Sequence, residues 1–213
     1  MIDVVAPHDY FAYRSELRQM FRLRHQVFKE RLGWDVHSRN GEERDEFDDC
    51  APYYLLARDH REAVVGTWRM LPTTGSYMLK DVFGVLLEGD APPEHPQVWE
   101  GSRFAVAALE RDRNGLSEPS RITSEIFCGV TEFCLNMGIR EVLTVYDIRL
   151  SRILPRAGCL PKARSRGHRI GNTISVMARF EMSEAFLRRL RRASNIAGSV
   201  IRSAPWLDVA KVA

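Results

Sequence analysis

The chain has 213 residues, which suits one domain or one domain with a small appendage. Hydrophobic residues make up 45% of it, enough for a sizeable core, and 31 Lys and Arg against 28 Asp and Glu leave a net charge of +3. This mild balance does not indicate a nucleic-acid-binding protein. Basic residues gather in 150–192 and acidic ones in 42–49, a distribution compatible with a local basic face for an acidic partner.

Cysteine and histidine spacing gives no sign of a metal site. The cysteines form no C-x-x-C pair, and the six histidines lack ligand spacing, so we expect no structural zinc. Scattered thiols and an N-terminus without a signal-peptide pattern fit a reducing cytoplasm. No apolar run approaches the length that spans a bilayer. The expectation is therefore a cytoplasmic protein with no metal, no membrane segment and no nucleic-acid partner.

The first half alternates helical and strand patterns. Asp9 is a plausible N-cap for a long helix that runs to about Leu32 and ends at Gly33. Arg24 falls within or beside the apolar stripe of this helix, which has helical spacing. The other predicted elements are a strand at 2–5, a polar loop at 35–52, strands at 53–58 and 63–71, a short helix at 79–87 and a strand at 98–107.

The second half continues the alternation. Its predicted elements are a helix at 119–137, a strand at 141–146 rich in β-branched residues, a helical segment at 148–157, a strand at 172–180 and a helix at 183–193. Pro155 should end or distort the segment that contains it. Strands and helices that alternate and then mix predict a layered α/β sheet under helices.

Several charged residues stand in unexpected places. Arg24 lies on a helix stripe that should face the protein, and Arg69 lies inside an apolar strand. Asp45 and Asp48 flank Phe47 in the acidic loop. Taken singly, the arginines could reach solvent along their stems and the aspartates could belong to a solvated loop.

Glu100 and Arg103 interrupt the predicted strand at 98–107. An unbroken strand would place them on opposite faces, whereas a bulge at Gly101 would bring both to one site. An ordinary pair on an edge strand is the alternative. Together, the arginines and carboxylates could form a buried ion network, or they could hold a ligand that carries both a cation and a carboxylate.

The order of these residues resembles that of the autoinducer synthases of the LuxI type. The match covers roughly positions 18 to 104 and comprises Arg24-x-x-x-Phe28, Trp34, Asp45-x-x-Asp48, Arg69 followed by Leu71-Pro72-Thr73-Thr74, and Glu100-x-Ser102-Arg103. The strings Phe21-Arg-Leu-Arg-His-Gln-Val-Phe28 and Leu79-Lys-Asp-Val-Phe83 add to it. The second half of the chain matches more loosely.

The resemblance implies an α/β fold like that of the N-acetyltransferases, with a mixed, V-split β-sheet flanked by helices in an α-β-α sandwich. It implies one domain over residues 1–213, in which 1–110 bind S-adenosylmethionine and 111–213 bind the acyl chain and its carrier. S-adenosylmethionine is then a substrate, and no cofactor is expected. The implied pocket for it is formed or braced by Arg24, Phe28, Trp34, Asp45, Asp48 and Arg103.

The resemblance also implies a reaction in which the amine of S-adenosylmethionine attacks an acyl thioester. Glu100 is the expected base, directly or through water, with Arg69 and Arg103 completing the catalytic set. The oxyanion needs a donor, expected to be a backbone N–H at the split in the sheet. The substrate carboxylate then closes the lactone and releases methylthioadenosine, which requires neither a metal nor a covalent enzyme intermediate.

The acyl donor is expected to be acyl carrier protein, with acyl-CoA as the alternative. Arg152 and Arg156, at i, i+4 spacing, are the expected docking residues, and Lys162, Arg164 and Arg166 could extend their patch. A solvated basic face is the alternative. The acyl pocket is expected to include Phe104, Thr144 and Tyr146. In the family a Thr near this position accompanies 3-oxo chains.

Two other classes compete with this interpretation. An acetyl-CoA-dependent N-acetyltransferase needs a Gln/Arg-x-x-Gly-x-Gly/Ala loop for the pyrophosphate, and the nearest string, Arg164-Ser-Arg-Gly167-His-Arg169, fails at its last position. A non-enzymatic acyl- or nucleotide-sensing module could keep the fold but has no need of the full set of charged residues. Formation of lactone and methylthioadenosine discriminates between them.

Overall fold

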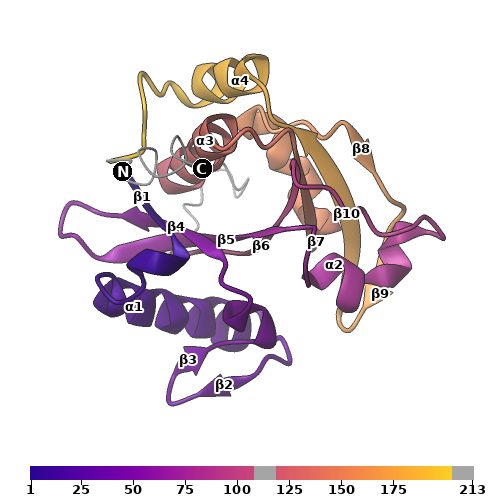
Figure 1. Cartoon of the computed structure of the whole chain (residues 1–213), viewed down its shortest axis with the longest axis horizontal. Coiled ribbons are helices and arrows are strands. Elements are labelled where there is room, and N and C mark those ends of the chain that lie inside the picture. The colour runs from indigo at the N-terminus through magenta and orange to yellow at the C-terminus, as the bar shows by residue number, and fades with distance from the viewer. Residues whose placement is uncertain (108–118, 203–213) are drawn as a thin grey trace.

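The computed structural model describes residues 1–107 and 119–202. Its described part contains an eight-stranded sheet in the order β1-β4-β5-β6-β7-β10-β8, with β9 paired to β10 (Figure 1). The strands are β1 (Ile2–Val5), β4 (Tyr53–Arg58), β5 (Val64–Pro72), β6 (Val98–Val106), β7 (Glu141–Asp147), β8 (Ala163–Arg164), β9 (His168–Ile170) and β10 (Thr173–Glu181).

The sheet opens between β6 and β7, its only parallel neighbours among the described strands. Their pairing begins at Val98 and Glu141 and ends at Gly101 and Thr144. Beyond that point β6 continues along β5, and β7 continues along β10. The two halves of the sheet therefore diverge in a V, as Figure 1 shows, and the predicted V-split, N-acetyltransferase-like fold is confirmed.

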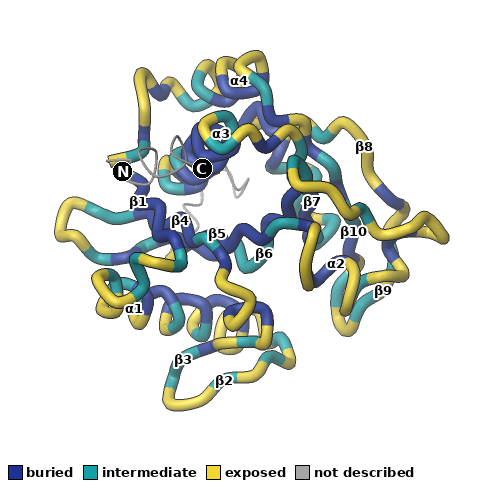
Figure 2. The backbone as a smooth tube through the Cα atoms, in the orientation of Figure 1, coloured by how far each residue is buried: buried dark blue, intermediate teal, exposed yellow. Residues whose placement is uncertain are grey.

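Helices cover both faces of the sheet. The helix α1 (Arg14–Arg24) packs against β5 and β6, while α3 (Arg121–Asn136) packs on β1, β4 and β5 and carries α4 (Glu184–Ser194) outside it. In Figure 2 much of the central strands and of α3 is coloured as buried. Ser120 and Ser183 cap α3 and α4, because each side chain accepts a backbone N–H three residues on.

Most predicted elements are confirmed to within one or two residues, and the exceptions have local causes. Asp9 does not cap a long helix: it closes a 3-10 turn (Pro7–Asp9), and α1 begins at Arg14. The same helix finishes as a π-helix (His25–Arg31), and its end at Leu32 and Gly33 is as predicted. Wider π turns are common at functional sites.

Three further segments differ from expectation. The polar loop at 35–52 contains a small hairpin, β2 (Ser38–Arg39) with β3 (Glu42–Glu43), and a 3-10 turn (Glu46–Asp49). The segment at 79–87 is two short helices, α2 (Met78–Asp81) and a 3-10 turn (Gly84–Leu87). The segment at 148–157 is two 3-10 turns (Ile148–Arg152 and Leu154–Ala157), because the Pro155 ring interrupts regular helix. No helix within 1–107 and 119–202 is long and apolar enough to cross a membrane.

Candidate functional site

Three arginines and three carboxylates form a closed ring between α1, the 3-10 turn at Glu46–Asp49 and strands β5 and β6. Each carboxylate bridges two arginines, and each arginine contacts two carboxylates. Around the ring the order is Arg24, Glu43, Arg103, Asp45, Arg69, Asp48 and back to Arg24. The sequence-predicted residues Arg24, Asp45, Asp48, Arg69 and Arg103 are thus brought together. Whether they bind a substrate stays a prediction.

Arg24 and Asp48 form the most regular contact of this ring. The Nη1 and Nη2 atoms of Arg24 donate to the two oxygens of Asp48 at 2.8 and 2.9 Å, and its Nε donates to Glu43 at 2.5 Å. All three side chains are fully buried. Bidentate, charge-assisted geometry of this kind offsets the large cost of removing ions from water.

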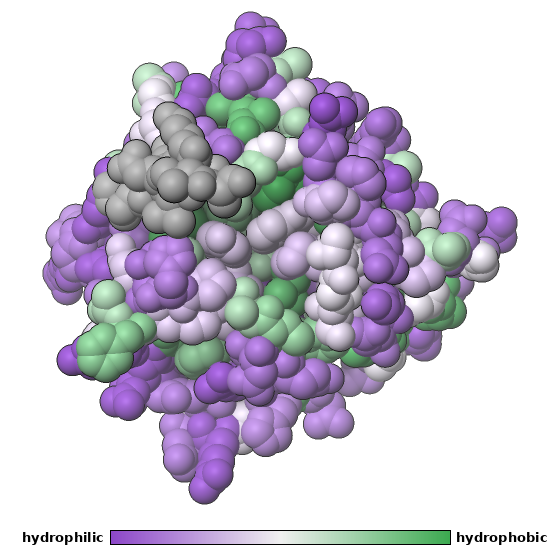
Figure 3. All heavy atoms as spheres, in the orientation of Figure 1, coloured by the Kyte–Doolittle hydropathy of each residue, from purple (hydrophilic) through white to green (hydrophobic). Residues whose placement is uncertain are grey.

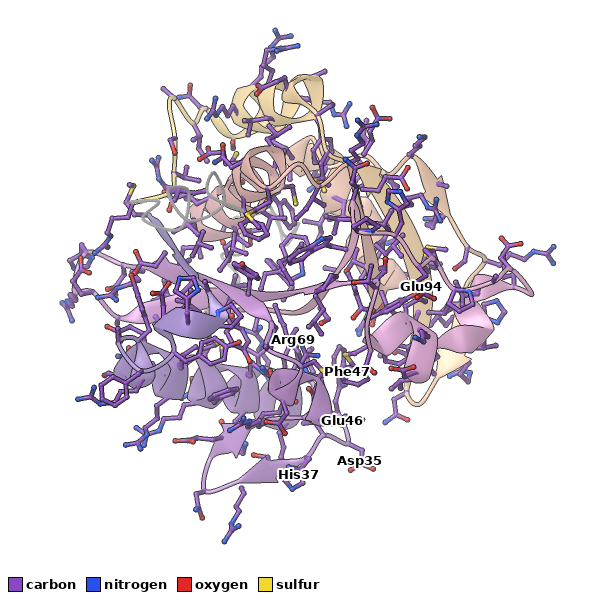
Figure 4. All side chains as sticks on the ribbon, in the orientation of Figure 1. Asp35, His37, Glu46, Phe47, Arg69 and Glu94 are labelled. Carbon is purple, nitrogen blue, oxygen red and sulfur yellow. The ribbon has the colours of Figure 1, made fainter. Side chains whose placement is uncertain are left out.

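Arg69 and Arg103 complete the ring from adjacent strands. Arg69 donates to Asp48 at 3.0 Å, to Asp45, and through Nε to Ser102 at 3.1 Å. Arg103 donates to Glu43 at 3.0 Å and contacts Asp45 at 2.7 Å. Figure 4 shows Arg69 next to Phe47 between α1 and α2, and its guanidinium lies 5.6 Å from the Phe47 ring centroid.

The acidic turn also has hydrogen bonds of its own, apart from those with the arginines. The side chain of Asp45 accepts the N–H of Phe47 at 3.0 Å, and the N–H of Asp45 donates to Asp48 at 2.9 Å. This reciprocal capping box fixes both carboxylates at the start of the turn. Burial opposes ionisation of Asp48, but the charges of Arg24 and Arg69 outweigh it and hold the pKa of Asp48 well below its ordinary range.

Glu100 lies beside the ring and is bound by the start of α2. Its carboxylate accepts the backbone N–H groups of Met78 at 2.9 Å and Leu79 at 2.6 Å. Burial raises the pKa of Glu100 above its ordinary value, against the lowering effect of those two donors and of Arg69 and Arg103. A carboxylate with a raised pKa is a better proton acceptor than an ordinary one.

Arg103 reaches the same site as Glu100 because β6 is bulged, though not at the predicted residue. Ser102 pairs with Arg69 and Ala105 pairs with Thr67, so Arg103 and Phe104 together oppose one residue of β5. Arg103 has φ of +55°, which turns its side chain toward the ring. The bulge was predicted at Gly101 and lies instead at Arg103 and Phe104, so its predicted position is wrong. The predicted result, that Glu100 and Arg103 reach the same site, is confirmed.

Phe28 and Trp34 form an aromatic wall near the ring. Their rings are stacked with centroids 5.2 Å apart and an interplanar angle of 8°. The guanidinium of Arg103 lies 5.6 Å from the Phe28 centroid. Phe28 belongs to the π-helix, and the N–H of Trp34 donates to its carbonyl at 2.9 Å, so the wider turn positions both rings.

Sequence reasoning missed two residues of the site. Glu43 is fully buried and bridges Arg24 and Arg103, whereas its neighbour Glu42 points outward to exposed arginines. Alternation along the β2–β3 hairpin could have separated them, had the hairpin been predicted. Met78 is the second: its sulfur accepts from Arg69 at 3.1 Å and from Arg103 at 3.4 Å.

The three residues expected to line the acyl pocket lie on the α3 face of the sheet, on the strands that diverge. Thr144 is the partner of Gly101 at the last paired position of β6 and β7. Phe104 packs against Trp68 and Phe127 with centroids 5.5 Å from each. Burial raises the pKa of Tyr146, against the lowering effect of Ser151 and Arg164. Their contact with an acyl chain stays a prediction.

Of the basic residues expected to dock a carrier, Arg152 and Arg156 are exposed and form no ion pair with any residue in the described ranges. The helical-face argument for them is wrong, because the segment is two 3-10 turns and not an α-helix. Lys162 contacts Glu141 and Glu181 at the opposite end of β7, so it does not extend the patch. Arg164 donates to Ser151, and Arg166 lies 3.7 Å from Glu88.

Residues 1–107 and 119–202 include no cluster of three His, Cys, Asp or Glu side chains that could hold a metal ion. The ring, Glu100 and the aromatic wall supply the charged and aromatic groups of the site. With all groups ionised, four carboxylates against three guanidiniums leave one negative charge. Such a site suits a ligand with a net positive charge and a carboxylate of its own.

Comparison with known proteins identifies relatives along most of the chain. The family model described as "Autoinducer synthase" matches residues 8–190. An acyl-homoserine-lactone synthase of Agrobacterium fabrum is 40% identical over 181 residues, covering 85% of this chain and 86% of that protein. One of Aliivibrio fischeri is 37% identical over 189 residues, covering 87% and 97% respectively.

Solved structures agree with this assignment. A CoA-dependent acyl-homoserine lactone synthase, BjaI, solved with MTA, has a TM-score of 0.81 and 27% identity, covering 100% of this chain and 99% of that one. The AHL synthase LasI has a TM-score of 0.76 and 32% identity, covering 95% and 98%. A putative N-acetyltransferase from Lactobacillus plantarum, at 12% identity and a TM-score of 0.54, shares the fold.

Proposed function

Since this chain belongs to the autoinducer synthase family, and is thereby an acyltransferase of the acyl-homoserine-lactone synthase class, we propose that it acylates the amine of S-adenosylmethionine and then closes the lactone. Residues 1–110 bind S-adenosylmethionine in this proposal, and 111–213 bind the acyl chain and its carrier. The protein acts in the cytoplasm and needs no cofactor beyond its two substrates.

The proposal is supported chiefly by the ring and by two arginine N–H groups that donate to a weak acceptor. Arg69 and Arg103 both direct an N–H at the sulfur of Met78, which is a weak acceptor. A substrate carboxylate is a far stronger acceptor for the same donors. The residual negative charge of the site complements the amine and sulfonium of S-adenosylmethionine, whose net charge is positive.

The remaining landmarks receive roles from their positions. Arg24, Asp45, Asp48 and Arg103 shape the pocket through the ring, and Phe28 and Trp34 offer aromatic faces to a cation or a purine. Arg69 orders the carboxylates from the centre of β5. These residues are held by one another, which supplies the preorganisation that substrate positioning requires.

Glu100 acts as the base in this proposal. Each of its oxygens accepts one backbone N–H and retains a second lone pair for a proton from the substrate amine or from water. The free amine attacks the thioester carbonyl, a C–N bond forms, and the carrier thiol leaves with the proton. The carboxylate of the substrate then attacks its own γ-carbon, and neutral methylthioadenosine departs from the sulfonium.

The acyl chain lies on the α3 face, where β6 and β7 diverge. Phe104, Thr144 and Tyr146 border this region. Figure 3, in the orientation of Figure 1, shows a hollow near the centre of the surface. Residues at the bottom of the hollow are apolar, and polar residues surround it. A thioester carbonyl placed at the split meets the backbone N–H groups that pairing no longer uses.

We propose acyl carrier protein as the donor, because Arg152 and Arg156 are exposed cations without a carboxylate partner in the described structure. Both belong to the 3-10 turns that follow β7, the strand that diverges from β6 after Thr144. The second candidate is acyl-CoA, favoured by the similarity to BjaI, described as CoA-dependent.

The test is product formation from purified protein. The chain is incubated with S-adenosylmethionine and a panel of acyl thioesters, each supplied on acyl carrier protein and on CoA. Mass spectrometry should find equimolar methylthioadenosine and acyl-homoserine lactone. Absence of both products across the panel would refute the proposal, and the preferred thioester identifies the donor and the chain length.

A further inference from the structure

The indole of Trp68 presents a buried hydrogen-bond donor that has no partner among residues 1–107 and 119–202. Its Nε1 is among four buried side-chain polar atoms of the described chain that lack one. Arg58 and Arg191, two of the other three, have further N–H groups in ion pairs. The fourth, Thr67, is the neighbour of Trp68 on β5 and therefore points to the opposite face. The indole N–H is the only hydrogen-bonding group of the Trp68 side chain, so within the described structure this side chain forms no hydrogen bond at all.

The position of this donor is at the split in the sheet. A Cβ at position 101 would lie 2.8 Å from Nε1 of Trp68, so the polar edge of the indole rests directly on Gly101. Gly101 and Thr144 form the last pair of β6 and β7. Glycine is therefore required at 101 for the donor to reach the point where the strands part.

Thr144 adds a second polar group on the same face. In a parallel pair, residues directly opposite direct their side chains to one side, so the Thr144 side chain lies beside Gly101 and its indole cover. Thr144 is buried, at 9% exposure. The unpaired indole N–H of Trp68 and the side chain of Thr144 thus flank Gly101 on one face of the sheet.

Apolar rings pack against the indole that carries the donor. Trp68 packs against Phe104 at 5.5 Å and Phe127 at 5.7 Å, and its side chain is 7% exposed. An unsatisfied N–H in such surroundings destabilises the free protein, and a carbonyl oxygen that enters removes the cost. Phe104, half-buried on the bulged part of β6, is the neighbour whose movement would admit a chain.

We propose that the indole N–H of Trp68 binds a carbonyl oxygen of the acyl group. This inference rests on the proposed function. Trp68 would then be a substrate-binding residue that recognises a carbonyl oxygen of the acyl group in addition to its hydrocarbon chain. Two carbonyls have this chemistry, that of the thioester and that of a 3-oxo chain. A site built to hydrogen-bond a carbonyl discriminates strongly against a chain that lacks it.

The kinetic experiment compares W68F with W99F on two acyl donors of equal length, one plain and one 3-oxo. Phe keeps an aromatic ring and removes the N–H. Trp99 is the matched control, because its Nε1 already donates to the carbonyl of Pro96 at 3.0 Å. W68F should lower kcat/KM about tenfold on the 3-oxo donor alone if the 3-oxo group is bound, or on both donors if the thioester is bound. W99F should leave the ratio between donors unchanged.

A spectroscopic readout separates hydrogen bonding from packing. In protein labelled with ¹⁵N-tryptophan, the indole resonance that W68F removes should move downfield when an acyl-pantetheine ketone analogue binds, and not when the carbonyl-free thioether binds. Either an unmoved resonance or W68F rates within about twofold of wild type on both donors overturns the proposal. Lactone formation by the wild type tests the proposed function separately, because it does not depend on the identity of residue 68.

Discussion

Arg24 and Glu43 are both fully buried, and the Nε of the arginine lies 2.5 Å from the carboxylate that also holds Arg103. Glu43→Gln should therefore lower the free energy of unfolding by about 3 kcal/mol, because two guanidiniums lose their shared counter-charge in a buried site. Urea unfolding monitored by circular dichroism measures this. Glu42→Gln is the matched control: Glu42 contacts Arg22 at 3.4 Å on the surface, and its loss should cost less than about 1 kcal/mol.

Acid should destabilise the fold through Asp48. The pKa of Asp48 is lowered in the folded protein, so its ionised form stabilises the fold above the unfolded-state pKa of about 3.9. That contribution is lost as the pH falls from there toward the folded-state value. Stability measured between pH 5 and pH 3 should fall less steeply in Asp48→Asn than in wild type. An unchanged slope in Asp48→Asn would contradict the prediction.

Glu100→Gln separates catalysis from binding. Loss of the base should reduce turnover by about 10²- to 10⁴-fold, while the affinity for S-adenosylmethionine changes only a few-fold. Because burial raises the pKa of Glu100, the wild-type rate should also fall on acidification at pH values above the ordinary range for a glutamate. Initial rates across pH and isothermal titration of S-adenosylmethionine are the measurements.

Glu94→Gln, an exposed site before β6, is the control for Glu100→Gln and should behave as wild type. Glu100 also binds the N–H groups of Met78 and Leu79, so a purely structural role is the competing explanation. That role would lower stability and S-adenosylmethionine affinity together with the rate. Turnover that stays near wild type would exclude Glu100 as the base.

Charge reversal tests the carrier-docking surface. The double variant Arg152→Glu, Arg156→Glu should raise KM for an acyl-carrier-protein donor about tenfold or more and weaken its salt dependence. With acyl-CoA the change should be smaller, since an acidic protein surface is no longer involved. Arg188→Glu on the outer helix α4 serves as the matched exposed control. Equal effects on both donors would argue against protein docking at this surface.

Gly101→Ala tests the packing at the split. The new methyl group would lie within 2.8 to 3.0 Å of three indole atoms of Trp68, so we expect a loss of about 1–3 kcal/mol in stability. Gly75→Ala is the control, because its Cβ would meet no atom within 4 Å and its φ is unexceptional. Thermal unfolding of the two variants, in parallel with wild type, gives the comparison. Equal stability would mean that the indole moves aside at little cost.

The sequence by itself determined the elements and the family. Apolar periodicity located α1, α3 and the central strands, because residues that face the core recur in the sequence with the period of the helix or strand that carries them. The resemblance, carried by residues between Arg24 and Arg103, identified the family and the V-split sheet, both of which the comparisons and strand pairing confirm. The predicted positions of helix ends and 3-10 turns were less accurate, because hydrogen bonds with distant residues decide which of several local conformations forms.

Only the tertiary structure decided how the charges meet. Arg24, Glu43 and Arg103 come from a helix, a hairpin and a bulged strand, and no local pattern states that their side chains converge. The αL conformation of Arg103 reverses the face that strand alternation assigns to it, and Trp68 reaches the split because Gly101 leaves room. Ion pairing and close packing depend on distances between elements, and those distances exist only after the sheet and helices have assembled.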